Sequence, residues 1–151
     1  MQYLVDTGVL LRLFDRKDPV HADVRLVLRH LRAHGHSFAI ATQNISEFWN
    51  VSTRPASARG GFGQSVETTE RRVQFLEERA TLLVETQQVY DQWRGLLIGH
   101  LLTGLAVHDA RLVAIMQAYD LTHILTLNGK DFARYPSVIA ISPQDIAAKA
   151  R

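Results

Sequence analysis

An aspartate stands directly after the first predicted strand. Residues 3–5 form a short, wholly apolar run, which is typical of a strand buried on both faces, and Asp6 follows them. Ligands of open parallel sheets bind beyond the carboxyl ends of the strands, so Asp6 lies where a site is expected. The structural alternative is that Asp6 only caps a helix beginning near Thr7. Its residue type and position make Asp6 a candidate catalytic carboxylate.

A second aspartate lies on the apolar face of a predicted helix. Leu112, Val113 and Met116 follow Asp109 by three, four and seven residues, which puts all of them on one side of the helix. Turning a carboxylate toward the core costs free energy unless a cation or hydrogen-bond donors compensate it. The alternative is a first-turn acid favoured by the helix dipole. The dipole explains an acid near the helix start, but it does not explain the face that Asp109 occupies.

Two further acids complete the candidate set. Glu47 lies beside the apolar face of the helix that follows the second predicted strand, and its alternative role is that of a surface glutamate. Asp131 follows the turn signal Asn128-Gly129 at the end of another strand, and its alternative role is to cap that turn. Like Asp6, Asp131 belongs to a segment that leaves the carboxyl edge of the predicted sheet.

Several carboxylates that meet at one sheet edge repel one another strongly. A hard divalent cation resolves this conflict, and the sequence contains no Cys that would supply thiolate ligands instead. Oxygen donors alone suit Mg²⁺, or Mn²⁺ in its place, and such ions commonly retain waters for substrate phosphates. The four acids therefore predict a metal site.

The elements that carry these acids alternate between strands and helices. The predicted strands cover residues 3–5, 38–41, 82–84, 123–126 and 138–141. The predicted helices begin near Thr7, cover 19–34 with Asp18 as the N-cap, follow Thr42 as a cap, and cover 66–79, 86–101, 107–119 and 143–150. Right-handed crossovers between such strands give a parallel sheet with helices on both faces. We expect one three-layer α/β/α domain over residues 1–151.

Composition limits the function classes. A chain of 151 residues with 46% hydrophobic and 21% charged residues is typical of one globular domain. The formal net charge of +2 is too small to argue by itself for nucleic acid or membrane binding, so phosphate binding must come from local clusters. No signal peptide or membrane-spanning run is recognisable, and we expect a soluble cytoplasmic protein with no membrane partner.

Four segments together resemble the PIN domain, the fold of many metal-dependent ribonucleases. They are most similar to the VapC toxins of prokaryotic toxin–antitoxin pairs, and the resemblance covers almost the whole chain. The segments are Leu4-Val5-Asp6-Thr7, Asn44-Ile45-Ser46-Glu47-Phe48, Gly104-Leu105-Ala106-Val107-His108-Asp109-Ala110 and Thr126-Leu127-Asn128-Gly129-Lys130-Asp131-Phe132. Each segment is weak alone, whereas their order and spacing in a chain of this size are fairly specific.

The resemblance implies a role for particular residues. Asp6, Glu47 and Asp109 match acidic metal-site positions of the family. Many relatives place the fourth acid where this chain has Asn128, and others use the aspartate three residues later, here Asp131. We choose Asp131, with Asn128 and Thr7 as polar helpers that orient water, and the departure leaves open whether a second ion binds. The implied reaction is hydrolysis of an RNA phosphodiester with one or two Mg²⁺ ions, with Glu47 or Asp131 accepting the proton of the water.

Basic residues beside the acids are candidates for holding the RNA backbone. They are Arg111, Lys130 and Arg134 near the acidic positions and Arg59 in the glycine-containing segment 53–65. The alternative for each is ordinary solvation. The resemblance further implies a homodimer and a cognate antitoxin that binds across the active-site groove, with one of its arginines on the carboxylates.

Two other functions compete with a toxin nuclease. One is a catalytically weak PIN module that binds RNA or a protein partner. The other is a Mg²⁺-dependent phosphatase of the haloacid dehalogenase type, but the second aspartate expected two residues after Asp6 is replaced by Gly8. The sequence does not identify the RNA, the cleaved base or the antitoxin.

Overall fold

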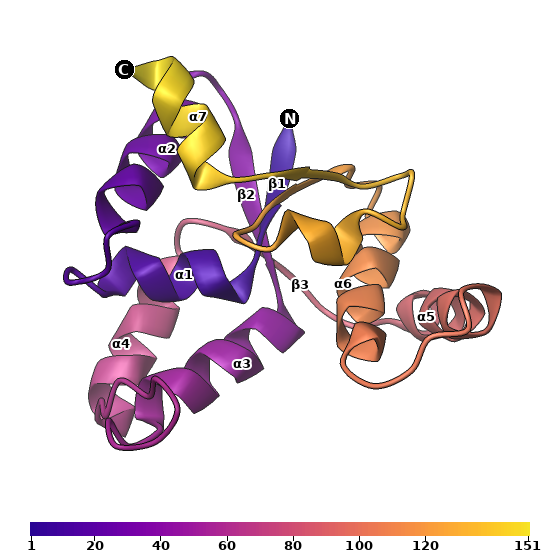
Figure 1. The fold of residues 1–151 in the computed structure, drawn as a ribbon, viewed down its shortest axis with the longest axis horizontal. Helices are drawn as coiled ribbons and strands as arrows, with labels where there is room; N and C mark the ends of the chain where they lie inside the picture. The colour runs from indigo at the N-terminus through magenta and orange to yellow at the C-terminus, as the bar shows by residue number, and fades with distance from the viewer.

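A five-stranded parallel sheet forms the centre of the molecule (Figure 1). The computed structural model describes all residues, 1–151. The strands are β1 (Gln2–Val5), β2 (Ser37–Ala41), β3 (Thr81–Leu83), β4 (His123–Leu125) and β5 (Ile139–Ile141). Their order across the sheet is β3-β2-β1-β4-β5, and every neighbouring pair is parallel. The chain thus adds β2 and β3 on one side of β1, and then β4 and β5 on the other side.

Helices cover both faces of this sheet. They are α1 (Thr7–Phe14), α2 (His21–Ala33), α3 (Thr42–Thr53), α4 (Val66–Glu77), α5 (Gln87–Gly99), α6 (Ala106–Ala118) and α7 (Pro143–Ala150), with a 3₁₀ helix η1 (Gly129–Phe132) before β5. Figure 1 shows α5 and α6 together on one side of the strands, and α1, α2, α4 and α7 on the other. None of these helices has both the length and the apolar character needed to cross a membrane.

The alternation of side chains along β1 divides the interior into two cores. Tyr3 and Val5 pack in one buried cluster with α1, α2, α3 and α4, whereas Leu4 packs in the other with α5 and α6. Both clusters consist of fully or nearly fully buried apolar side chains. The predicted three-layer α/β/α architecture is therefore confirmed, since the sheet is buried on both faces.

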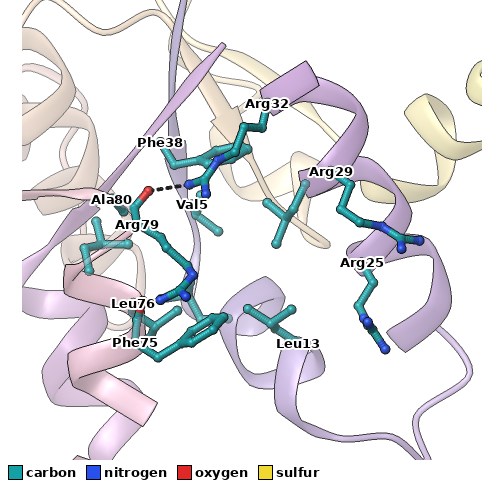
Figure 2. Close-up of a pocket in the computed structure, with 13 residues that line it drawn as sticks. Val5, Leu13, Arg25, Arg29, Arg32, Phe38, Phe75, Leu76, Arg79 and Ala80 are labelled. Atoms are coloured by element: carbon teal, nitrogen blue, oxygen red, sulfur yellow. Dashed lines mark hydrogen bonds between the residues drawn. The ribbon is translucent and has the colours of Figure 1, made fainter. Parts of the chain in front are cut away.

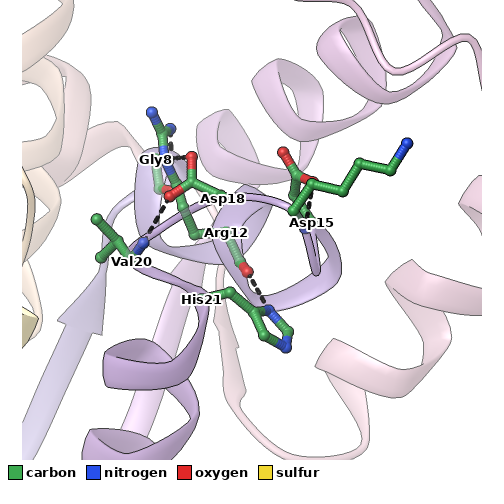
Figure 3. A network of polar contacts seen from close by, with 7 residues as sticks. Gly8, Arg12, Asp15, Asp18, Val20 and His21 are labelled. Atoms are coloured by element: carbon green, nitrogen blue, oxygen red, sulfur yellow. Dashed lines mark hydrogen bonds and ion pairs between the residues drawn. The ribbon is translucent and has the colours of Figure 1, made fainter.

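The start of α2 differs from the sequence prediction. Asp18 does not cap this helix, which begins at His21 after a turn. The Asp18 carboxylate instead accepts from the backbone N–H of Val20 at 2.8 Å and pairs with Arg12 at 3.3 Å (Figure 3). His21 Nδ1 contacts the carbonyl of Arg12 at 2.8 Å. Asp18 therefore connects the turn before α2 to α1, because one of its partners, Val20, lies in that turn and the other, Arg12, lies in α1.

The first turn of α3 also differs from the prediction. Thr42 is the first helical residue rather than the cap, and Ala41 precedes it with extended backbone. The side chain of Asn44 accepts from the backbone N–H of Ala41 at 2.9 Å, which fixes the passage from β2 into α3. This turn carries residues of the candidate site.

Candidate active site

Asp6 lies where the sheet changes its direction of growth. It follows β1, and its N–H donates to the carbonyl of Leu125 at the end of the neighbouring β4. From β1 the chain continues into α1 on one face, whereas Phe132, after β4, packs in the core of the other face. Such a switch point leaves a crevice beyond the strand ends, which is where α/β sheets bind ligands.

Two donors fix the carboxylate of Asp6. Oδ1 accepts from the backbone N–H of Thr7 at 2.8 Å, so Asp6 does cap α1. Oδ2 accepts from the hydroxyl of Thr126 at 2.6 Å. The same hydroxyl oxygen accepts from the N–H of Asn128 at 3.1 Å. Asp6 can therefore cap α1 and also act in a site, because each carboxylate oxygen accepts one hydrogen bond and keeps a further lone pair.

Glu47 is held on both oxygens as well. Its Oε2 accepts from the hydroxyl of Thr7 at 2.7 Å, and its Oε1 accepts from the amide of Gln43 at 3.0 Å. Asn44, which is completely buried, donates to the Thr7 oxygen at 3.1 Å. Thr7 thus connects Asp6 to Glu47 through its backbone N–H and its hydroxyl.

Asp109 and Asp131 complete the acidic edge without such donors. Asp109 lies half-buried in the first turn of α6, and Asp131 is exposed on η1. The hydrogen bonds of this edge end on Asp6 and Glu47, and none involves the carboxylates of Asp109 and Asp131. The two aspartates therefore retain their full capacity to accept.

The four acids interact electrostatically. Burial, followed by the charges of Asp131, Asp6 and Glu47, raises the pKa of Asp109 to about 6, with His108 acting in the opposite sense. Burial also raises the pKa of Asp6; the hydrogen bonds from Thr126 and Thr7 oppose this rise, and the charges of Glu47 and Asp131 add to it. The structure thus brings together the four carboxylates that the sequence singled out.

No lysine or arginine side chain forms an ion pair with these four acids. The ion pairs of the structure involve other acids, namely Asp18, Asp23, Glu78 and Glu85. Mutual repulsion without internal compensation is the condition under which a carboxylate cluster favours a bound cation or a cationic partner.

The chemistry of the donors fits a hard divalent ion, because every donor is a carboxylate, hydroxyl or amide oxygen. The arrangement of the side chains is not that of a closed metal site, since no three His, Asp or Glu residues lie close enough to hold one ion together. Asp6 and Glu47 instead direct their oxygens to neutral donors. An ion held by three or more of these acids at once therefore requires them to move toward one another, whereas an ion held by one or two carboxylates and water does not.

The predicted RNA-binding residues separate into two kinds. Arg111 pairs with Glu85 at 2.5 Å and lies 5.9 Å from the centre of the Trp93 ring, so its charge is already engaged. Lys130 and Arg134 are exposed on and beside η1, the element that carries Asp131. Arg59 is exposed in the segment between α3 and α4, and its φ of 33° places it in the left-handed region.

Three neutral polar residues of the site were not assigned a role from the sequence: Gln43, Asn44 and Thr126. Their exposed fractions are 8%, 0% and 1%, so all three are buried although their side chains are polar. Spacing gave a partial signal, because Asn44 precedes the apolar Phe48 by four residues and so shares its buried helix face. Polar residues in such positions are expected to bind other buried groups.

A separate hollow of about 270 Å³ lies between α1, α2, α4 and β2 (Figure 2). Most of its lining is apolar, and Figure 2 shows arginine side chains around it. The arginines are Arg25, Arg29, Arg32 and Arg79. Its lining contains no acid, and Val5, which lines it, directly precedes Asp6. The hollow therefore suits a ligand that has both apolar groups and negative charge, whereas the acidic edge suits a cation.

Comparisons with known proteins agree with the fold of this chain. Solved structures with the same fold include VapBC2 from Rickettsia felis bound to a DNA fragment from their promoter, with a TM-score of 0.66 and 16% identity over 94% of this chain and 98% of that chain. VapBC-1 from nontypeable Haemophilus influenzae gives a TM-score of 0.66 and 18% identity over 95% and 99% of the two chains. Mycobacterium tuberculosis VapC20, described as a sarcin-ricin loop cleaving toxin, gives 0.62 and 16% over 88% and 95%.

Sequence comparison gives the family. No curated protein matches the chain significantly. The family model of the PIN domain matches residues 3–138, which contain all four acids and, apart from Gln2, the strands β1 to β4; β5 lies just beyond the match. The chain therefore belongs to the PIN domain family.

Proposed function

We propose that the protein is a divalent-metal-dependent endoribonuclease and the toxin of a toxin–antitoxin pair. The observation that carries this proposal is the convergence of Asp6, Glu47, Asp109 and Asp131 at the switch point of the sheet without an ion-paired lysine or arginine. Membership of the PIN family supports it, as do solved structures of the same fold that are described as VapBC proteins and as a sarcin-ricin loop cleaving toxin.

The residues at the acidic edge have two different roles in this proposal, namely to hold the ion and to orient its ligands. Asp6, Glu47, Asp109 and Asp131 would hold Mg²⁺, with Mn²⁺ as a substitute. When bound, such an ion lowers the pKa of water and offsets the negative charge of the scissile phosphate. Thr126 and Thr7 fix the orientation of Asp6, so that its carboxylate is in place before the substrate arrives.

The proton of the attacking water goes to Asp131 in this proposal. Both oxygens of Glu47 already accept hydrogen bonds, from Gln43 and from Thr7. The carboxylate of Asp131 is exposed and accepts none within the protein. A general base needs an accessible lone pair; about two of the four lone pairs of the Glu47 carboxylate accept hydrogen bonds, whereas all those of Asp131 are open, which favours Asp131.

RNA contacts are assigned to the cations nearest the acids. Lys130 and Arg134 are exposed and flank Asp131, so they can neutralise phosphates on either side of the cleaved bond. Asn128, exposed before η1, remains a proposed polar helper, whereas Arg111 is engaged by Glu85.

An antitoxin partner explains two further surfaces. A partner arginine placed on the unpaired acids would neutralise them and block the site. The arginine-lined hollow suits an apolar, acidic segment of the same partner, because charge and apolar lining complement such a segment. A homodimer of the protein remains part of the proposal.

The decisive test is cleavage of a pool of structured RNAs, including ribosomal fragments, by the protein in Mg²⁺, in EDTA, and as the Asp109→Asn variant. Mg²⁺-dependent cuts that disappear in EDTA and with Asp109→Asn support the proposal. A matched control is Asp91→Asn, which changes an exposed aspartate on α5. Cleavage that survives EDTA would contradict it.

A binding module with little catalytic power is the second candidate. The observation that favours it is that no three His, Asp or Glu side chains are placed to hold one ion. In that case RNA would be retained in a binding assay but remain intact under every condition. The same RNA pool therefore separates the two functions.

A further inference from the structure

We propose that Gln43 is a positioning residue that sets the separation between the carboxylates of Glu47 and Asp109 through a single amide group. The inference rests on the acidic edge being the metal site proposed above. Gln43 lies in the first turn of α3, four residues before Glu47. It does not belong to the acids and would not touch the ion directly.

One nitrogen of Gln43 connects two elements of the site. Nε2 donates to Oε1 of Glu47 at 3.0 Å and to the backbone carbonyl of His108 at 3.1 Å. His108 directly precedes Asp109 in α6. The two protons of the amide therefore go to the Glu47 carboxylate and to the backbone from which the Asp109 side chain extends.

The helices joined in this way belong to different layers. Phe48 of α3 packs in one core, and residues 112–116 of α6 pack in the other. The sheet lies between the two cores, so contacts at its edge determine how far apart the two acids stand. Gln43 supplies a hydrogen-bonded connection at that edge.

The chemistry of the two neighbours fixes the orientation of the amide. Both are acceptors, so only the NH₂ group can face them; a reversed amide would put oxygen against two oxygens. This orientation costs free energy, because Oε1 of Gln43 is left buried without a hydrogen-bond partner. The side chain is 8% exposed, so water does not compensate this oxygen readily. An amide that leaves its acceptor unused is retained for its two donors.

A purely structural role would be to join α3 to α6 with no effect on ion binding. The two roles differ in what they change. Loss of a structural link lowers the melting temperature alone. Loss of a positioning residue weakens ion binding and lowers kcat, whereas KM for RNA is little changed because Gln43 is buried and the exposed cations assigned to RNA are retained.

The test uses Gln43→Met, which keeps the length of the side chain and removes both donors. Mn²⁺ binding is measured by calorimetric titration of the whole protein, the melting temperature is measured in EDTA, and kcat and KM are measured on a cleaved RNA. We expect the affinity for Mn²⁺ to fall about 10- to 100-fold, as is typical when a group that orients a metal ligand is removed.

Gln92→Met is the matched control. Gln92 lies on α5, and its Oε1 is also buried without a partner, but none of the hydrogen bonds at the acidic edge involves it. We expect this variant to bind Mn²⁺ as the parent does. If Gln43→Met does not fold, Gln43→Asn takes its place, because it keeps an amide that is one methylene too short to reach both acceptors.

The outcomes separate the inference from the function on which it rests. If the parent binds Mn²⁺ and cleaves RNA, but the Gln43 variant binds Mn²⁺ equally well, Gln43 is structural and the inference is wrong. If the parent neither binds Mn²⁺ nor cleaves RNA, the proposed function fails and the inference falls with it. Reduced Mn²⁺ affinity in the Gln43 variant only, with KM preserved, supports the positioning role.

Discussion

The hydroxyl of Thr126 donates to Oδ2 of Asp6 at 2.6 Å, although the two residues are 120 positions apart in the sequence. The bond joins the ends of β1 and β4, the two strands at which the sheet changes its direction of growth. It gives a half-buried carboxylate a neutral donor in the absence of any ion-paired cation. The orientation of Asp6 therefore depends on a residue that lies outside the acidic set.

Thr126→Val tests this dependence. The substitution keeps the shape of a side chain that is 1% exposed but removes the donor to Asp6 and the acceptor of the Asn128 N–H. We expect the free energy of unfolding to fall by about 1–3 kcal/mol, because buried polar groups lose their partners. Cleavage should fall as well. Thr126→Ser, which retains the hydroxyl, should behave like the parent in denaturant titration and in the RNA assay; equal loss in both variants would assign the effect to packing.

Asp109→Asn tests the repulsion between the acids. Asp109 is a better position for this test than Asp6. No hydrogen bond of the edge involves the Asp109 carboxylate, whereas a substitution of Asp6 would also disturb the hydrogen bonds from Thr7 and Thr126. In EDTA we expect the melting temperature of Asp109→Asn to rise by a few degrees, at ~2–4 °C per kcal/mol for a chain of this size. Added Mg²⁺ should stabilise the parent and scarcely affect the variant. A lower melting temperature than the parent in EDTA would identify Asp109 as a structural residue.

The pH dependence of stability follows from the same aspartate. In the folded protein the pKa of Asp109 is about 6, above its ordinary value of 3.8, so the folded state binds its proton more tightly than the unfolded state does. The stability linked to this group is complete below pH 3.8 and is lost as the pH rises through about 6. In EDTA, the melting-temperature difference between Asp109→Asn and the parent should grow between these pH values and then level off. A difference that stays constant from pH 4 to pH 7 would contradict the assignment.

The basic residues make separable predictions for RNA binding. Arg134→Ala and Lys130→Ala remove exposed cations beside Asp131, and each should raise KM and reduce the slope of log affinity against log salt by about 0.7 for single-stranded RNA. Arg111→Ala should leave that slope unchanged, because Glu85 already neutralises Arg111. Salt titrations of RNA binding by the three variants provide the measurement. A reduced slope for Arg111→Ala only would reverse the assignment.

The arginine-lined hollow predicts where an acidic partner binds. Arg25 and Arg29 are exposed on α2 and form none of the ion pairs of the structure. Replacing both by Glu should weaken binding of the protein encoded by the neighbouring reading frame, mainly through slower association, and should leave RNA cleavage intact. Surface binding kinetics measure the effect. The control is Arg71→Glu, an exposed arginine of α4 that does not line the hollow.

The sequence by itself determined the layers and the acids. Short apolar runs such as residues 3–5, separated by helical periodicity, favour a buried parallel sheet, and strand polarity made Asp6 and Asp131 candidates, whereas Asp109 was noticed from its helix face. The start of α2 was misplaced because the partners of Asp18 lie in its own turn and in Arg12, not in the helix that follows. Local helix propensity does not reveal that these partners compete with the helix N-terminus for the Asp18 carboxylate.

Only the tertiary structure decided how the acids are held. Thr126 reaches Asp6, and Gln43 reaches the carbonyl of His108, across long stretches of chain that periodicity and propensity do not connect. The engagement of Arg111 by Glu85 is of the same kind. A hydrogen bond between side chains depends on positions to within a fraction of an ångström, and those positions are fixed by the packing of α3 and α6 against opposite faces of the sheet.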